Sequence, residues 1–305
     1  MTLASSRLAG APSRLPRSHS RGLTPYLLLG RVSNLPTVWT NTLAGVALAG
    51  APVGTGRLAL LALAFSLLYT GGMYLNDAFD REIDARERPE RPIPSGRVRA
   101  GSVFAIGFGL LLAGVLAVAW TPGAGRGSVW AALLLAAVIT AYDAWHKANP
   151  LSPVVMGLCR VLVYVTAALA VSGRVGPAVA GGALVLLGYL IGLTYVAKQE
   201  NLTEVRNLWP LAFLAAPFLY AAPALPWTGA AAVLYLGFLG WVVSAVSWLV
   251  RPGRRDIRRA VVSLIAGISL LDALLIAGAG DPGRAVWAVG AFLLTLALQR
   301  WVPGT

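Results

Sequence analysis

Apolar segments, each about as long as a lipid bilayer is thick, follow one another along most of this 305-residue chain. A transmembrane helix needs about 20 mainly apolar residues. The segments of that kind cover residues 34–52, 58–77, 101–121, 127–143, 153–172, 176–196, 208–223, 228–250, 258–279 and 284–302. The seventh is short and contains Pro210, Pro217 and Pro223, so we expect it to be kinked or to span only in part. The sequence therefore predicts an all-α, polytopic membrane bundle of nine or ten transmembrane helices.

Composition agrees with a lipid environment. Hydrophobic residues make up 57% of the chain and charged residues 12%, whereas a soluble domain carries about 25% charged residues. Disordered, fibrous and disulfide-stapled proteins are excluded by the same figures. Cys159 stands alone, and the two histidines are His19 and His146, which leaves little for a cysteine–metal cluster or a Ser-His-Asp triad. Any chemistry must come from carboxylates, amides and basic groups.

Basic residues are divided unequally between the two sides of the predicted bundle. With the N-terminus inside, twenty Lys and Arg fall on the inner side and four on the outer side, namely Arg57, Arg126, Arg174 and Arg284. The positive-inside rule then predicts a multi-pass protein of the cytoplasmic (inner) membrane with a cytoplasmic N-terminus. Because the net charge of +13 sits in short loops, we expect no nucleic-acid partner. We expect residues 1–30 to be a flexible basic arm and 31–305 to be a single transmembrane domain.

Acidic residues are scarce and concentrated. Of the twelve in the chain, six lie between residues 77 and 90. Asn76, Asp80 and Asp84 follow a spacing of four, and Asp77 joins the same face of a helix. Carboxylates stacked in this way repel one another, and Mg²⁺ resolves the conflict because it bridges one or two carboxylates to a phosphate. The alternative is a solvated helix end whose carboxylates pair with the arginines that follow.

A second acidic pair follows the sixth predicted span. Glu200 and Glu204 are again four residues apart, on the same predicted side of the membrane. Two acidic helix ends that face one another would hold two cations around one diphosphate. Lys147, Arg88 and Arg91 are the candidates to bind the remaining phosphate oxygens.

The first acidic pattern is part of a longer motif. Asn-Asp-x-x-Asp-x-x-x-Asp at 76–84, followed by Arg-Pro-Ile-Pro-Ser-Gly at 91–96, resembles the first signature of the UbiA superfamily of intramembrane prenyltransferases. The resemblance extends to the order of the spans and so covers most of the chain. It implies a helical bundle around a lipid-open cavity. It also implies Mg²⁺-dependent transfer of a prenyl group from an isoprenoid diphosphate to an aromatic or other small acceptor.

The pattern and the resemblance together predict the site residues. The expected metal ligands are Asn76, Asp77, Asp80, Asp84, Glu200 and Glu204. The expected substrate-binding residues are Arg31, Asn34, Asn76, Arg88, Arg91 and Tyr142. The expected catalytic residues are Asp80, Asp84, Lys147 and Glu200. The second motif departs from the superfamily's usual Asp-x-x-x-Asp, and with the Val-Pro-Gly-Thr ending it resembles the EboC-like branch.

Two other classes of protein remain open. One is a non-catalytic protein that binds a prenyl lipid. The other is a secondary transporter, which would have inverted repeats and polar breaks near the midplane, whereas the polar residues here gather at one end. The acceptor of an enzyme remains open among a hydroxybenzoate, a naphthoate, haem, a tetrapyrrole and a sugar phosphate. We expect contact with membrane lipid and infer no obligatory protein partner.

Two ionisable residues lie within predicted spans. We expect Asp272 to face the interior of the bundle, where it is hydrogen-bonded or protonated, because a charged group is costly in contact with lipid. Arg160 is expected to snorkel to the inner face or to pair with Asp143.

Overall fold

A computed structural model of the chain describes residues 24–147, 149–198, 209–223, 229–250, 255–302 and 304. Within these ranges the regular structure is helical. The elements in chain order are α1 (Thr24–Leu29), η1 (Val32–Asn34), α2 (Leu35–Leu48), α3 (Thr55–Phe79), α4 (Arg81–Glu87), α5 (Ala100–Ala119), α6 (Arg126–Trp145), α7 (Ser152–Ser172), α8 (Pro177–Lys198), η2 (Trp209–Ala215), α9 (Ala216–Ala221), α10 (Gly229–Val250), α11 (Ile257–Gly278) and α12 (Pro282–Leu298).

The helices follow the predicted spans closely. In the described part of the chain, seven helices are long and apolar enough to cross a membrane, and the apolar stretches Trp209–Ala221 and Pro282–Leu298 are shorter. The expected count of nine or ten spans is thus approximately met, and the all-α class is confirmed. The seventh span is irregular as expected, because the 3₁₀ segment η2 leads into the short helix α9. Of the predicted N-terminal arm, residues 1–23 lie outside the described residues, and Thr24–Leu29 forms α1.

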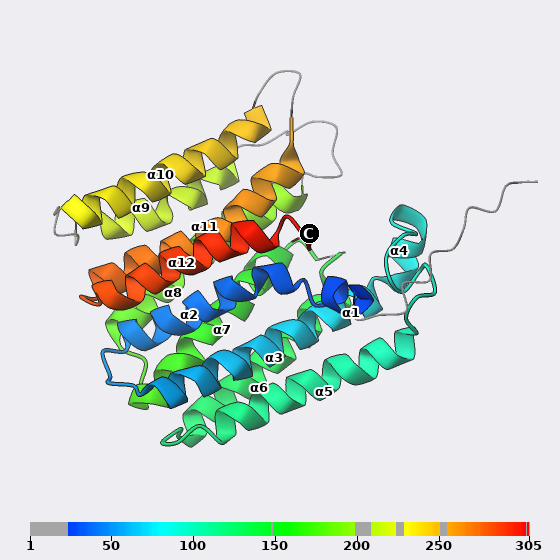
Figure 1. The fold of residues 1–305 in the computed structure, drawn as a ribbon, viewed down its shortest axis with the longest axis horizontal. Coiled ribbons are helices and arrows are strands. Elements are labelled where there is room, and N and C mark those ends of the chain that lie inside the picture. The colour runs from blue at the N-terminus through cyan, green and yellow to red at the C-terminus, as the bar shows by residue number, and fades with distance from the viewer. Residues whose placement is uncertain are drawn as a thin grey trace, which may run out of the picture.

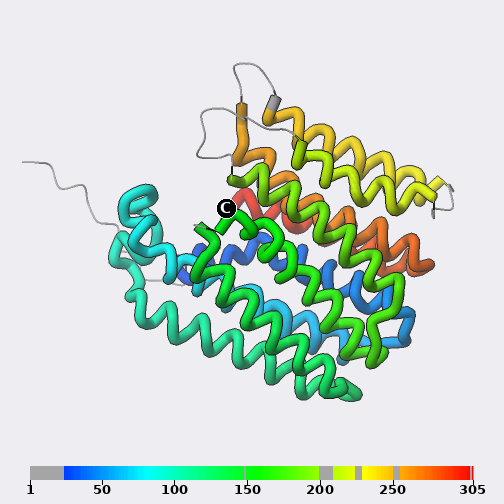
Figure 2. The backbone as a smooth tube through the Cα atoms, turned by 180° about the vertical axis from the view of Figure 1, so that it is seen from behind, coloured from blue at the N-terminus to red at the C-terminus, as the bar shows by residue number. Residues whose placement is uncertain are grey.

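The long helices lie side by side with their axes roughly aligned (Figure 1). Helices α9 and α10 form one edge of the bundle and α5 the opposite edge, and α11 lies between α10 and α12. Seen from behind, α6, α7 and α8 run across the face nearest the viewer (Figure 2). Helices α1 and α4 and the C-terminal end lie at the same end of the bundle (Figure 1). That end is where the predicted acidic motif lies.

Helix α3, which carries the motif, packs tightly on α5 through glycines. A Cβ atom on Gly71 would lie 2.8 Å from the carbonyl oxygen of Gly107, and a Cβ on Gly114 would lie 2.9 Å from the carbonyl oxygen of Ala64. Small residues let two helix backbones approach this closely in a membrane, where van der Waals packing drives their association. The close contact fixes α3 along its length.

The acidic motif does not form one regular helix. Helix α3 ends at Phe79 and α4 begins at Arg81, with Asp80 between them. The backbone N–H of Asp80 still donates to Asn76, at 2.9 Å, and its carbonyl oxygen accepts from Asp84, at 2.9 Å. In Figure 1, α4 turns away from the axis of α3. The expectation that residues 76–84 share a single helix face therefore needs correction, since the chain bends at Asp80.

Candidate active site

Four polar side chains at the end of α3 are buried together. The exposed fraction is 7% for Asn76, 6% for Asp77, 6% for Asp80 and 3% for Asp84. Buried carboxylates are costly unless they are paired with charges or hydrogen-bond donors. The helices and loops around them supply such partners.

Two arginines face the carboxylates from other segments. Arg91, in the loop after α4, has its Nη1 atom 2.7 Å from Asp84 Oδ2 and 3.4 Å from Asp77 Oδ1. Arg31, between α1 and η1, has its Nη2 atom 3.2 Å from Asp77 Oδ1 and 3.3 Å from Asn76 Oδ1. Burial alone would lower the pKa of Arg31, but the Asp77 carboxylate together with the Tyr69 and Tyr142 hydroxyl groups raises it above its ordinary value. Arg31 therefore remains a cation in the site.

Asp80 faces a second pair of basic groups, at the end of α6. Its Oδ2 atom lies 3.5 Å from His146 Nε2 and 3.5 Å from Lys147 Nζ. Burial alone would raise the pKa of Asp80, but the hydrogen bonds and charges of His146 and Lys147 hold it below its ordinary value. Tyr142 stacks on the ring of His146, with centroids 4.9 Å apart. Asp80 is therefore an ionised carboxylate at neutral pH.

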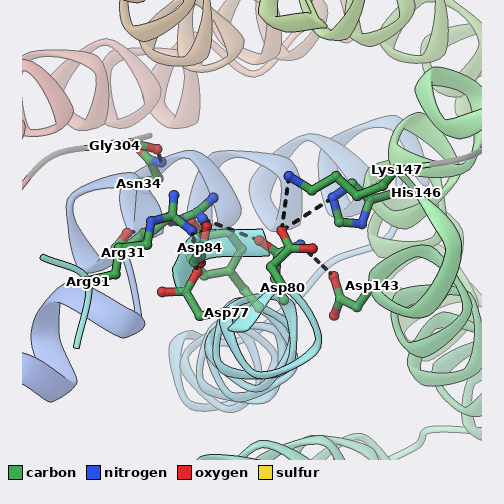
Figure 3. A network of polar contacts seen from close by, with 12 residues as sticks. Arg31, Asn34, Asp77, Asp80, Asp84, Arg91, Asp143, His146, Lys147 and Gly304 are labelled. Atoms are coloured by element: carbon green, nitrogen blue, oxygen red, sulfur yellow. Dashed lines mark hydrogen bonds and ion pairs between the residues drawn. The ribbon is translucent and has the colours of Figure 1, made fainter. Parts of the chain in front are cut away.

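Asp143 connects the two groups and has an oxygen to spare. Its Oδ1 atom accepts a hydrogen bond of 3.2 Å from Asn76 Nδ2. Its Oδ2 atom and His146 Nδ1 are buried without a hydrogen-bond partner among the described residues. Figure 3 shows Asp80 between Lys147 and His146 on one side and Asp143 on another, while Arg31 and Arg91 lie beside Asp77 and Asp84. The site thus alternates carboxylates and cations around a polar centre.

A metal ion would need to enter among these pairs. Within the ranges that the structure describes, no three histidine, cysteine or carboxylate side chains are arranged as a ready metal site. Instead, Arg91 and Lys147 contact the carboxylates. The donors are nevertheless oxygens, and Mg²⁺ is typically held by one or two carboxylates together with substrate phosphates. The unsatisfied oxygen of Asp143 is one further ligand atom. The donor set therefore fits Mg²⁺.

The remaining predicted residues are distributed as follows. Asn34 donates to the carbonyl oxygen of Gly304, at 2.9 Å, and accepts from Gln299 Nε2, at 3.2 Å. Arg88 follows α4, where its backbone N–H donates to the Asp84 carbonyl oxygen at 2.8 Å. Glu200 and Glu204 lie outside the described residues. Of the predicted set, the structure brings together Arg31, Asn76, Asp77, Asp80, Asp84, Arg91, Tyr142 and Lys147.

An apolar cavity begins beside this cluster and continues between α3, α6 and α7. Tyr142 and Asp143 line it at the polar end. The other lining residues are Val38, Phe65, Leu68, Tyr69, Gly72, Met73, Leu135, Ile139, Met156, Cys159, Arg160 and Val163. The arrangement places an apolar cavity directly against a charged centre.

Asp143 and His146 lie in the candidate site, although the sequence motifs do not predict them as site residues. Both belong to the segment Tyr142–Lys147 at the end of α6, as do the predicted residues Tyr142 and Lys147. Their signal was their place in that polar segment next to a predicted span. Helical spacing also points to it, because Asp143 and Lys147 are four residues apart and so lie on one side of the helix end.

Comparison with known proteins agrees with the family resemblance of the acidic motif. The sequence model of the UbiA prenyltransferase family matches residues 38–302. The chain is 31% identical over 283 residues to a protein of Methanopyrus kandleri named digeranylgeranylglyceryl phosphate synthase, covering 89% of this chain and 97% of the relative.

Solved structures share the fold. One, described as giving structural and mechanistic insights into digeranylgeranylglyceryl phosphate synthase in membranes, has a TM-score of 0.60 at 20% identity and covers 84% of this chain and 98% of its own. Another is a UbiA homologue from Archaeoglobus fulgidus bound to GPP and Mg²⁺. It has a TM-score of 0.51 at 15% identity and covers 90% of this chain and 99% of its own.

Proposed function

Because the chain belongs to the UbiA prenyltransferase family and is thus a multi-pass membrane prenyltransferase, we propose that the acidic end of α3 binds the diphosphate of its isoprenoid substrate through Mg²⁺. Asn76, Asp77, Asp80 and Asp84 are the proposed metal ligands in this region. Asp80 and Asp84 are also the proposed catalytic carboxylates. Glu200 and Glu204 complete the proposed ligand set from the segment after α8.

The observation that carries this proposal is the juxtaposition of buried carboxylates and cations at the mouth of an apolar cavity. Asp77, Asp80 and Asp84 each form an ion pair with Arg31, Arg91 or Lys147, and Asp143 is linked to them through Asn76. A diphosphate needs both kinds of group, since metal-bound carboxylates hold one side and basic residues donate charge-assisted hydrogen bonds to the other. An ordinary solvated helix end does not bury its carboxylates to this extent.

The proposed chemistry is ionisation of the prenyl diphosphate. Bound Mg²⁺ supplies positive charge against the diphosphate as it leaves. Arg31, Arg91 and Lys147 hold the same oxygens, and this stabilisation of developing charge is usually the largest catalytic contribution. The apolar cavity takes the prenyl chain and excludes water from the allylic cation. The rings of Tyr69 and Tyr142, which line the cavity, stabilise that cation through their faces.

The proposed acceptor is a hydroxyl-bearing lipid with a glyceryl phosphate head. Similarity over nearly the full length to a digeranylgeranylglyceryl phosphate synthase supports this choice. In the transfer, the hydroxyl oxygen of the acceptor forms a bond to C1 of the prenyl group, the bond from C1 to the diphosphate oxygen breaks, and the hydroxyl proton leaves. The hydroxybenzoate, naphthoate, haem and tetrapyrrole acceptors are alternative outcomes of the test below.

We further propose that the site opens to the cytoplasm and that the protein lies in the cytoplasmic membrane. The charged cluster is at the end of the bundle that carries α1 and α4. Twenty of the Lys and Arg residues are assigned to that side by the order of the spans. A cysteine introduced at Glu90, which is exposed, is tested with a membrane-impermeant thiol reagent in intact and opened cells to measure this orientation.

The function is tested with purified protein in detergent or nanodiscs. Geranylgeranyl or farnesyl diphosphate is supplied with Mg²⁺, with geranylgeranylglyceryl phosphate or 4-hydroxybenzoate as acceptor, and diphosphate release and the product mass are followed. Asp84→Asn is expected to remove turnover. The control Glu82→Gln replaces an exposed carboxylate and is expected to leave turnover unchanged. Absence of Mg²⁺-dependent binding or release with either prenyl diphosphate, or full activity of Asp84→Asn, overturns the proposal.

A further inference from the structure

A chain of buried polar side chains crosses the bundle away from the carboxylate cluster. Arg160 on α7 donates from Nη1 to Asn41 Oδ1 on α2, at 2.8 Å. Asn41 Nδ2 donates to Asp272 Oδ2 on α11, at 2.8 Å, and Tyr164 donates to the other oxygen of Asp272. Asn41, Tyr164 and Asp272 are each 0% exposed. The expectation that Asp272 faces the interior is confirmed. Arg160 was expected to snorkel to the inner face or to pair with Asp143, and in the structure it contacts Asn41.

The positive charge of Arg160 is linked to a carboxylate only indirectly, through Asn41. Among the described residues, no carboxylate lies within 4.0 Å of its guanidinium, and the charge of Asp272 reaches it through the amide of Asn41. Its CZ atom lies 5.4 Å from the centroid of the Tyr69 ring. An ionisable side chain within a membrane span is costly and points to function when it faces an internal cavity. Arg160 is such a residue, because it lines the apolar cavity.

The geometry leaves Arg160 with donors to spare. A guanidinium has five N–H groups, and the hydrogen bond to Asn41 uses one of them. The Asn41–Asp272 hydrogen bond orients the amide of Asn41, and this amide in turn orients the guanidinium of Arg160. A rigid fork of donors matches the oxygens of a phosphate or a carboxylate.

Arg160 is also close to the diphosphate site without belonging to it. The hydroxyl of Tyr69 donates to the carbonyl oxygen of Arg31, at 3.5 Å, and the Tyr69 ring is the one that Arg160 faces. Tyr142 and Asp143 line the same cavity as Arg160. An anion bound at Arg160 would therefore share the cavity with a prenyl group whose diphosphate lies among Arg31, Arg91 and Lys147.

We propose that Arg160 selects the acceptor by binding its anionic group inside the cavity, with Asn41 and Asp272 as positioning residues. This inference rests on the proposed function, and it narrows the acceptor to one that carries a phosphate or a carboxylate. Binding of the diphosphate by Arg160 is a less suitable role, because the proposed diphosphate site already has three cations at the mouth of the cavity. A purely structural arginine would not discriminate between charged and neutral acceptors.

The test measures acceptor affinity without turnover. Dissociation constants are measured in nanodiscs for geranylgeranylglyceryl phosphate and its neutral counterpart geranylgeranylglycerol, and in a second arm for 4-hydroxybenzoate and phenol. Arg160→Gln is expected to raise the dissociation constant of one of the two charged probes by about 10- to 100-fold, because one to two charge-assisted hydrogen bonds are lost. The dissociation constant of the neutral probe in the same pair should not change. Arg160→Lys is expected to recover part of the loss. The arm that responds identifies phosphate or carboxylate as the anionic group.

Arg57→Gln is the matched control, since Arg57 is a partly buried arginine of α3 that donates to the Ala170 carbonyl oxygen instead of lining this cavity. Equal affinity of wild type and Arg160→Gln for both charged probes, or an equal loss for charged and neutral probes, overturns the inference. Binding of geranylgeranyl diphosphate with Mg²⁺ is measured on the same variants. If the wild type does not bind geranylgeranyl diphosphate with Mg²⁺, the proposed function is wrong. If the wild type binds it but Arg160→Gln leaves the affinity for both charged acceptor probes unchanged, only the inference is wrong.

Discussion

Arg91 Nη1 lies 2.7 Å from Asp84 Oδ2, so the loop after α4 is tied back to the helix that precedes it. The same nitrogen lies 3.4 Å from Asp77 Oδ1. One guanidinium thus holds together two carboxylates on either side of the bend at Asp80. In the proposed function, the same guanidinium contacts a phosphate group bound between the two carboxylates.

Replacement of Arg91 by Gln is expected to raise the KM for geranylgeranyl diphosphate by about tenfold or more, because charge-assisted hydrogen bonds to the phosphate are lost. Arg91→Lys keeps the charge but loses the fork geometry of the guanidinium, so its KM should lie between those of the wild type and Arg91→Gln. Steady-state kinetics at saturating acceptor measure both values. Arg97→Gln is the control, as Arg97 is exposed and contacts Ser95 and the Glu90 backbone in the same loop. An unchanged KM for Arg91→Gln would contradict the assigned role.

Replacement of Asp80 by Asn is expected to raise the Mg²⁺ concentration for half-maximal activity by at least about tenfold. Loss of even an outer partner of a metal ligand costs about 10- to 100-fold in affinity or activity, and Asp80 is proposed as a direct ligand. A Mg²⁺ titration of diphosphate release measures the shift. If Asp80→Asn and wild type respond to Mg²⁺ identically, Asp80 is not a ligand.

Gly71→Ala is expected to destabilise the protein by about 1–3 kcal/mol, as overpacking does in a tight interface. The added Cβ would lie 2.8 Å from the backbone oxygen of Gly107, which cannot move aside freely. Thermal unfolding in detergent measures the change. Gly109→Ala on α5 is the control, since its Cβ would meet nothing within 4 Å, and there alanine should be neutral or slightly stabilising in a helix. Equal melting temperatures for the two variants would rule out the tight α3–α5 contact.

Tyr164→Phe is expected to lower the free energy of unfolding by about 0.6 kcal/mol, and by at most about 1.7 kcal/mol, the average and the maximum measured for hydrogen bonds between membrane helices. The substitution keeps the ring and removes the donor to Asp272. Chemical or thermal unfolding reports the loss, and Tyr26→Phe on the partly exposed helix α1 serves as the reference. If Tyr164→Phe is as stable as Tyr26→Phe, the hydrogen bond from the Tyr164 hydroxyl to Asp272 does not contribute to the stability of the fold.

The fold was largely predictable because lipid imposes a simple rule. Long apolar stretches must form helices that satisfy their own backbone hydrogen bonds, so the ten predicted segments correspond to the helical stretches from α2 to α12. The bend at Asp80 and the short helices α1 and α4 were not predictable in this way. They lie at the end of the bundle, where hydropathy no longer decides the backbone geometry.

The site was predictable where residues share a motif and less so where they come from distant segments. Asp77, Asp80 and Asp84 follow from spacing alone, and the resemblance to a family added Arg31. The link between Asn41 and Asp272, 231 residues apart, has no such signal. A buried polar residue in an apolar helix shows that a partner is needed, but one sequence does not reveal which of the other helices supplies it.

The contact between Gly304 and Asn34 has a practical consequence for expression. Gly304 lies beside Asn34, at the same end of the bundle as the charged cluster (Figure 3), so a purification tag fused after it would lie close to the proposed diphosphate site. Activity should therefore be compared before and after cleavage of any tag fused at this point.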